Sequence, residues 1–374
     1  MDRTDAVGSR QMAAAAFVAL LSPCIRRFPR ALALYAGRSA YLAPLLAFLP
    51  VGAGLLLAHL ALRRLRDVTD LGGLFRRAAG ERAGRALELL YALWLTLYAG
   101  FLLRAGADRF ITTVYPGAGP WVFALTMAAV CLPAVAGPWR AVGRTAALLR
   151  PLLLAIPALL VLLALKDLRP ELLLPVERAD LLPNLRGALE LANGLSAAVY
   201  LTVLAGEAGP LRLRDFALWG GVLLALLAAL TAACLAMLGP ELTARMLHPF
   251  FMLVRDVSVL GALERVEPLV IGLWVFSDFV LISALLSAAV RCLRSGLALP
   301  PAGEGLRRCG LPPYLCAAVA AAAAIRAIPD LRVFEALNEL WMPRANALFA
   351  VFLPACALVV ALVKENVVKR DGSA

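Results

Sequence analysis

The sequence predicts an all-α integral membrane protein with about ten transmembrane helices. Of its 374 residues, 62% are hydrophobic and 17% are charged, whereas soluble globular chains are about half apolar and about a quarter charged. The apolar residues fall in long runs that are almost free of charge, such as 45–62, 146–165 and 217–238. Each run approaches the length of about 20 residues that a helix needs to cross the hydrocarbon core of a bilayer.

The spans are predicted to be helices because unpaired backbone groups are prohibitive in lipid and strand-like alternation is absent. The first span starts near Gln11 and passes through Ser22-Pro23-Cys24. The other nine are predicted, in order, over 39–62, 87–110, 121–136, 146–165, 187–205, 216–238, 266–290, 311–328 and 343–363.

Lys and Arg in the loops predict the orientation, because cytoplasmic loops are enriched in them. With the N-terminus inside, the 2–3 loop, the 8–9 loop and the C-terminal tail carry Arg63, Arg64, Arg66, Arg76, Arg77, Arg82, Arg85, Arg291, Arg294, Arg307, Arg308, Lys364, Lys369 and Arg370. The opposite loops hold the acids Asp167, Glu171, Glu177, Asp180, Asp330, Glu335 and Glu339. Arg26, Arg27 and Arg30 are exceptions to this rule. Both termini are therefore predicted to be cytoplasmic.

Two connections are longer than turns. Residues 71–89 are polar with a helical pattern and predict an interfacial helix on the cytoplasmic side. Residues 241–267 mix Phe250, Phe251 and other apolar residues with charges, which predicts an amphipathic segment lying outside. Glu264 and Glu267 at its end are expected to face solvent or a partner.

The chain divides into two halves of five spans, 11–165 and 187–363, within a single transmembrane domain. The first span of each half is interrupted, by Ser22-Pro23-Cys24 in helix 1 and by Asn193-Gly194 in helix 6. With five spans each, the halves would have inverted topology. Paired interruptions at corresponding positions are the best sequence indication of a transporter site.

The predicted site lies at mid-membrane between helices 1, 3, 6 and 8. Broken helices expose backbone N–H groups that favour a carboxylate and carbonyls that favour an ammonium, so the site suits an amino acid. The candidate substrate-binding residues are Ser22, Pro23, Cys24, Asn193, Gly194, Ser196 and Asp278. The alternative is that both breaks are kinks satisfied by neighbouring helices.

Other charged and aromatic residues each have a structural alternative. Asp278, near the middle of helix 8, is either a pocket-lining acid or a buried acid paired with an Arg of a neighbouring helix. Arg104 and Asp108 lie four residues apart on helix 3 and are expected to pair. Trp94 and Tyr98 are expected to serve packing or interface anchoring. His59 is expected to be a polar group with its hydrogen bonds satisfied. Glu190 is expected to lie at the membrane interface.

The same composition excludes several function classes. No nucleophile–base pair, phosphate loop or metal-ligand spacing is found, so neither an enzyme nor a cofactor is predicted. The seven cysteines lie mostly in or beside apolar runs and are expected to act as small hydrophobic residues. The net charge of +12 is confined to short loops and forms no basic face with interleaved aromatics, so nucleic acid is not an expected partner.

The stretch from His248-Pro-Phe-Phe through Glu264-Arg265-Val266-Glu267 to Trp274 resembles the endospore germination permeases, the B subunits of nutrient germinant receptors. Gln11, Leu89-Leu-Tyr91 and Gly187-Ala-Leu fit the same family. The resemblance implies the amino acid/polyamine/organocation superfamily, a five-plus-five inverted repeat and a central solute pocket. It also implies an A-type membrane subunit and a C-type lipoprotein subunit as partners in the inner spore membrane.

Two departures from the family pattern fall in the predicted site. Where the family has Gly-x-Gly in helix 1 this chain has Ser22-Pro23-Cys24, and where Gly-x-Glu is common in helix 6 it has Ala197-Ala198-Val199. The expected function is a germinant receptor B-type subunit that binds a small nutrient, such as an amino acid, and signals to partner subunits. The alternatives are a proton-coupled secondary amino-acid transporter and a membrane scaffold with a degenerate pocket.

Overall fold

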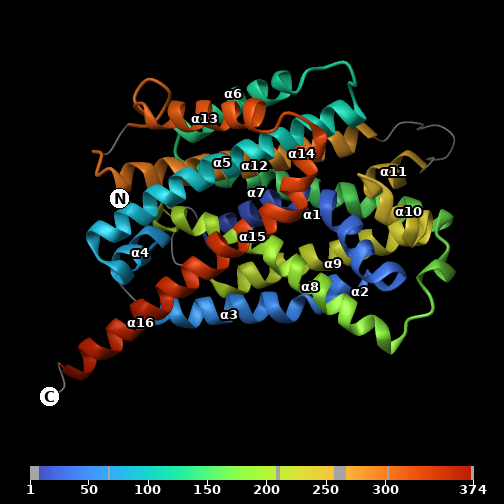
Figure 1. Cartoon of the computed structure of the whole chain (residues 1–374), viewed down its shortest axis with the longest axis horizontal. Helices are drawn as coiled ribbons and strands as arrows, with labels where there is room; N and C mark the ends of the chain where they lie inside the picture. Colours follow the sequence, from blue (N-terminus) through green and yellow to red (C-terminus); the bar gives the residue numbers. More distant parts are fainter. Residues whose placement is uncertain (1–7, 66–67, 208–210, 257–266, 301–302, 372–374) are drawn as a thin grey trace.

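The computed structural model describes residues 8–65, 68–207, 211–256, 267–300 and 303–371, and these form a bundle of helices (Figure 1). Within the described part, eight helices are long and apolar enough to cross a membrane. Two further apolar helices, Pro120–Ala136 and Pro312–Ala327, are shorter. Together they account for the ten predicted spans and confirm the all-α membrane fold.

The first five spans run from α1 to α7. They are α1 (Ser9–Ala36), α2 (Leu42–Leu46) with α3 (Phe48–Arg64), α5 (Glu81–Thr113), α6 (Pro120–Ala136) and α7 (Trp139–Ala164). α7 starts seven residues before the predicted position, because the polar start of the helix, with Arg140 and Arg144, lowers the hydropathy of its first turns.

The second five spans begin at α8 (Leu181–Leu195), which continues as a 3₁₀-helix over Ser196–Glu207. They continue with α9 (Leu213–Leu238), α12 (Glu267–Gly296), α13 (Pro312–Ala322) and a π-helical turn (Ala323–Ala327), and finally α14 (Leu331–Ala336), α15 (Met342–Asn346) and α16 (Leu353–Asp371) with π-helical turns between them. The last span starts at Leu331, twelve residues before the predicted Pro343, because Arg332, Glu335 and Glu339 mask its helical start.

The predicted interfacial helix over 71–89 is divided in the structure. α4 (Leu71–Ala79) is capped by Asp70, whose Oδ1 accepts a hydrogen bond of 2.8 Å from the Gly73 N–H. Gly80 then adopts φ 83°, a left-handed conformation that ends α4 and lets α5 begin at Glu81. The remainder of 71–89 is therefore the first part of the third span.

The predicted outer segment over 241–267 contains two short helices, α10 (Pro240–Arg245) and α11 (Pro249–Asp256). Residues 257–266, including Glu264, lie outside the described part. α10 and α11 lie at one end of the bundle, and α4 and the end of α16 lie at the opposite end (Figure 1).

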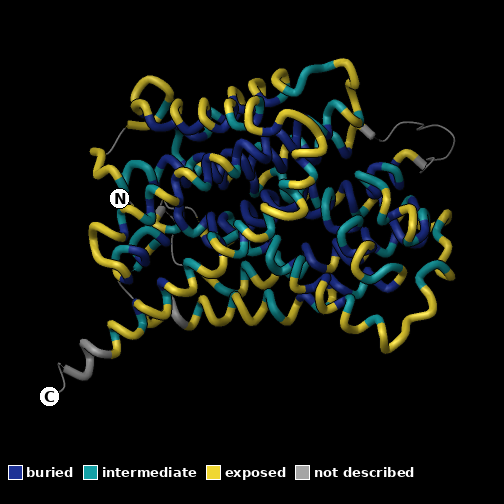
Figure 2. The backbone as a smooth tube through the Cα atoms, in the orientation of Figure 1, coloured by how far each residue is buried: buried dark blue, intermediate teal, exposed yellow. Residues whose placement is uncertain are grey.

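α1 runs through the middle of the bundle, where it packs against α7, α8, α9 and α12. Burial follows this arrangement: the tube is mostly buried along the centre and mostly exposed along α3 and α16 (Figure 2). In a bilayer those exposed apolar surfaces face lipid. The two interrupted helices of the predicted site, α1 and the α8 span, are therefore in contact in the protected interior.

Candidate functional site

The predicted interruption of helix 1 takes the form of a side-chain insertion. α1 continues past Pro23, but the Ser22 N–H donates a hydrogen bond of 2.9 Å to the Ser277 Oγ of α12. The Ser277 hydroxyl in turn donates to the Val18 carbonyl at 2.5 Å. An uninterrupted α-helix joins the Ser22 N–H to the Val18 carbonyl directly. Ser277 thus bridges the two groups from a neighbouring helix.

Arg109 of α5 contacts both Ser22 and Asp278. Its Nη1 donates 2.7 Å to the Ser22 Oγ, and its Nη2 is bonded to the Asp278 carboxylate. Its guanidinium carbon also lies 5.0 Å from the centroid of the Trp274 ring. Arg109 and Asp278 are both buried, so each charge needs the other to offset its lost hydration. Of the two interpretations of Asp278, the structure therefore shows the pairing with a neighbouring arginine.

The interruption of helix 6 is the change from α- to 3₁₀-helix at Ser196. Asn193 Nδ2 donates 2.9 Å to the Pro343 carbonyl, and Ser196 Oγ donates 2.6 Å to the Asn193 carbonyl. Asn346 Nδ2 donates to the same carbonyl and, at 3.0 Å, to Ser196 Oγ. The last span therefore satisfies the polar groups that the helix change exposes.

Glycine at position 194 allows α1 to approach α8 closely. A Cβ atom at Gly194 would lie 2.5 Å from a ring carbon of Phe28, which is buried on α1. Any larger residue would displace the Phe28 ring. The contact brings the second half of helix 1 against the interrupted part of helix 6.

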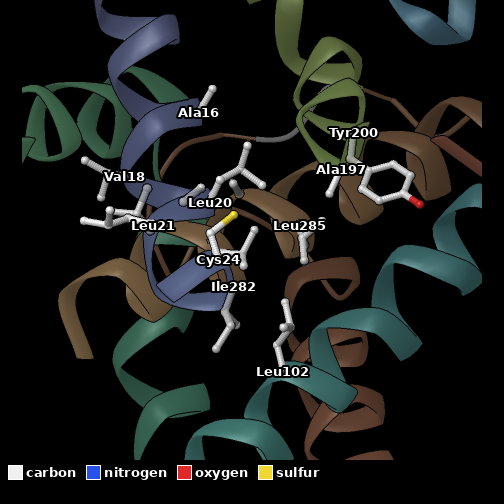
Figure 3. Close-up of a cluster of buried hydrophobic side chains, with 14 of the residues drawn as sticks. Ala16, Val18, Leu20, Leu21, Cys24, Leu102, Ala197, Tyr200, Ile282 and Leu285 are labelled. Atoms are coloured by element: carbon white, nitrogen blue, oxygen red, sulfur yellow. The ribbon is translucent and has the colours of Figure 1, made fainter. Parts of the chain in front are cut away.

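Aromatic side chains extend the Asn193 network. Tyr200 OH donates 2.9 Å to Asn346 Oδ1 and accepts 3.0 Å from Trp94 Nε1, while the Trp94 and Tyr98 rings stack at 5.5 Å. Cys24 lies in a cluster of buried side chains that includes Leu20, Leu102 and Ile282 (Figure 3). Cys24 is therefore surrounded by hydrophobic packing in this conformation.

A cavity of about 320 Å³ opens beside the second half of α1. None of the seven predicted site residues lines it; Arg109 does, and Arg109 contacts two of them, Ser22 and Asp278. The charged lining residues are Arg26, Arg27, Arg30, Asp108, Arg109, Glu190, Glu335 and Glu339. Arg109 therefore both lines the cavity and contacts the predicted mid-membrane position.

Ion pairs neutralise most of these charges. Arg27 pairs with Glu190, and Arg30 lies 3.8 Å from Glu335 and 3.4 Å from Glu339. Arg104 Nε lies 2.8 Å from Asp108 Oδ1, which confirms the predicted pair on helix 3. Glu190, which was expected to be interfacial, pairs with Arg27 at the cavity.

His248, in the turn before α11, also lines the cavity. Its Nδ1 is buried and has no hydrogen-bond partner among the described residues. Burial, reinforced by the positive charges of Arg109, Arg26 and Arg30, lowers the pKa of His248 to about 3. The imidazole is therefore neutral at physiological pH.

Sequence reasoning missed Ser277 and Arg109. Ser277 directly precedes Asp278, and Arg109 follows the expected Arg104–Asp108 pair, but one sequence does not give the rotation of each helix. Arg26 and Arg27 stood out as exceptions to the charge distribution, and that was a usable signal. Among the described residues, no three His, Cys, Asp or Glu side chains gather in a way that could hold a metal ion.

Comparison with solved structures identifies the fold. The chain is similar to a structure described as the substrate-bound outward-open state of a Na⁺-coupled sialic acid symporter with a novel Na⁺ site. The two share 10% identity, a TM-score of 0.62, and coverage of 96% of this chain and 90% of that one. At this identity the likeness shows the fold alone: this chain has the all-α membrane fold of that symporter.

The sequence profile of the spore germination protein family, a permease family, matches residues 7–300. This match covers more than half of the chain, so the protein belongs to that family, which confirms the resemblance seen in the sequence. Among curated proteins, no sequence matches the chain.

Proposed function

We propose that this transporter-like germination protein acts as a B-type subunit of a germinant receptor. It binds a small nutrient, with an amino acid as the best candidate, and signals to an A-type membrane subunit and a C-type lipoprotein subunit in the inner spore membrane. The observation that carries the proposal is that Arg109 lines the cavity and that its guanidinium contacts Ser22 on helix 1 and Asp278 on helix 8. Ligand in the cavity can act on the centre of the bundle through this one side chain.

The proposed inner site is the mid-membrane position formed by Ser22, Pro23, Cys24, Asn193, Gly194, Ser196 and Asp278. Pro23 supplies no backbone N–H, so the Ala19 carbonyl lacks its usual helical donor. The Ser22 N–H and the Val18 carbonyl depend on Ser277 rather than on each other. Such groups can exchange a protein partner for a ligand at little cost. Arg109 must move for a nutrient in the cavity to reach them.

Ligand-dependent stability tests this proposal. The full chain, purified in detergent, is melted with each proteinogenic amino acid, and one of them is expected to raise the melting temperature. Ser22→Leu and Asn193→Leu place bulk in the proposed inner site and are expected to abolish that shift. If the shift survives both changes with unchanged affinity, the nutrient binds elsewhere.

Two further measurements separate a receptor from the alternatives. Co-expression with A- and C-type subunits is expected to give a complex that purifies as one species and that changes its melting behaviour with the same nutrient. Uptake of that nutrient into proteoliposomes by this chain alone would instead indicate a proton-coupled secondary transporter. A protein that binds its partners but no nutrient would be a scaffold.

A further inference from the structure

We infer that the cavity contains an outer binding site for a zwitterion, with Arg26 as the carboxylate receptor and the Glu335–Glu339 pair as the ammonium receptor. This site is distinct from the proposed mid-membrane site, although the inference rests on the proposed function because it assumes that a small nutrient enters the cavity. The volume of about 320 Å³ lies near the lower end of the range of roughly 300–1,000 Å³ of small-molecule sites.

Arg26 is the lining arginine without a carboxylate partner in the described part of the chain. Arg27, Arg30 and Arg109 each pair with an acid, whereas the Arg26 guanidinium lies over the Phe334 ring at 5.8 Å. The side chain is partly buried, so it has lost part of its hydration without gaining an anion. A planar guanidinium in this state is suited to bidentate binding of a carboxylate.

Glu335 and Glu339 carry a surplus of negative charge. Both face Arg30, at 3.8 and 3.4 Å, so two carboxylates share one guanidinium. The Glu339 side chain is 56% exposed and is accessible to a ligand. Phe334, against which Arg26 stacks, directly precedes Glu335, so Arg26 on α1 and the two acids on the last span face the same cavity.

The overall charge of the cavity favours a zwitterion over a simple anion. Four arginines (Arg26, Arg27, Arg30 and Arg109) and four acids (Asp108, Glu190, Glu335 and Glu339) line it. The two partners behind the lining, Arg104 and Asp278, also cancel. His248 adds no charge because its pKa is lowered to about 3. The cavity is therefore neutral, with its positive and negative surplus on different helices, and a ligand with both charges preserves that neutrality.

Binding by matched analogues tests the inference on the full chain in detergent. The probes are the amino acid that raises the melting temperature most, its amide, which lacks the carboxylate, and its deaminated acid, which lacks the ammonium. Both analogues are expected to bind at least about tenfold more weakly, because each lacks one contact to a charged group.

Two variants assign the ends of the ligand. Arg26→Gln is expected to weaken amino-acid binding about 10- to 100-fold and to leave binding of the amide unchanged. The double variant Glu335→Gln/Glu339→Gln is expected to weaken the amino acid and to leave the deaminated acid unchanged. Arg307→Gln removes an exposed arginine far along the chain and serves as the control. Arg26→Lys keeps the charge without the planar fork, so it provides a milder variant if Arg26→Gln does not fold.

The outcomes separate this inference from the proposed function. If Arg26→Gln or Arg26→Lys and the double glutamate variant keep wild-type affinity while Ser22→Leu and Asn193→Leu abolish binding, the outer site is overturned and the proposed function stands. If the amide binds as well as the amino acid, the role of Arg26 is overturned. If no amino acid stabilises the wild-type chain, the proposed amino-acid function fails first.

Discussion

Ser277 shows how one hydroxyl can stabilise an irregular membrane helix. It accepts from the Ser22 N–H and donates to the Val18 carbonyl, and all three residues are fully buried. In lipid, no water is present to take over these bonds. Ser277 therefore satisfies two backbone groups of α1 one residue before Pro23, where the helical hydrogen-bond pattern is interrupted.

Replacement of Ser277 by Ala is expected to lower the free energy of unfolding by about 1–3 kcal/mol, because a buried N–H is left without a partner. Unfolding by SDS titration in mixed micelles measures the effect. Ser287→Ala is the matched control, since Ser287 lies on the same helix and its hydroxyl has no partner in the described part of the chain. Equal stabilities of the two variants would mean that α1 closes the Ser22–Val18 bond on its own.

His248 gives the protein a specific sensitivity to acid. Its pKa is about 3 in the folded protein because of burial and nearby arginines, against about 6.5 in an unfolded chain. Between these values the unfolded chain binds the extra proton, so stability falls as the pH falls through this window. His248→Gln removes this dependence, and wild type is expected to lose about 1 kcal/mol more than the variant between pH 7 and 5, with allowance for partial exposure.

Melting curves of both proteins across this pH range measure the difference. Comparison with the variant isolates the contribution of His248 from that of every other group in the protein. Parallel pH profiles for the two proteins would show that His248 is solvated and free to protonate in the folded state.

At the scale of elements, α4 connects three spans at one end of the bundle. Arg76 is bonded to Glu88 on α5 and, at 2.6 Å, to Ser295 Oγ on α12. Arg291 of α12 lies 3.1 Å from Asp70, the residue that caps α4. Lys364 of α16 donates 2.7 Å to the Ala78 carbonyl. α4 therefore holds the ends of the third, eighth and tenth spans together.

Adjacent arginines on α4 offer a matched test of this role. Arg76→Met leaves Glu88, which is only 1% exposed, as a buried unpaired charge and is expected to cost about 2–4 kcal/mol. Arg77→Met breaks the more exposed pair with Glu365 and is expected to cost less than about 1 kcal/mol. Hydrogen exchange over α4 reports local release. Arg76→Met/Glu88→Gln is expected to recover part of the loss, and no recovery would contradict the buried-charge explanation.

The sequence alone predicted the long apolar helices well, but it predicted poorly where helices with charged residues begin. Hydropathy alone is enough to find runs such as 217–238. The start of the last span at Leu331 was hidden by the charges of Arg332, Glu335 and Glu339, and the two glutamates line the cavity. Contacts between distant residues were beyond reach. Ser22 and Ser277 are 255 positions apart, and their meeting depends on how α1 and α12 rotate and shift against each other.

For the whole molecule, the fold links the charge distribution to an orientation. α4 and the end of α16 share one end of the bundle, where Arg77 contacts Glu365 at 2.7 Å (Figure 1). The last turn of α3 adds Arg63 and Arg64 just before the connection to α4. Cytoplasmic loops are enriched in such residues, so this end is expected to be cytoplasmic, with α10, α11 and the cavity beside the second half of α1 on the outer side.

Cysteine labelling in a Cys-less background measures the orientation in intact cells. A cysteine at Ser373, beyond the described residues, is expected to resist an impermeant maleimide until the membrane is opened. A cysteine at Glu177, in the acidic connection before α8, is expected to react from outside. The reverse pattern would place the cavity on the cytoplasmic face, and an external nutrient could then not reach Arg26 without first crossing the protein. The labelling result therefore determines whether this chain can sense nutrients from outside the membrane.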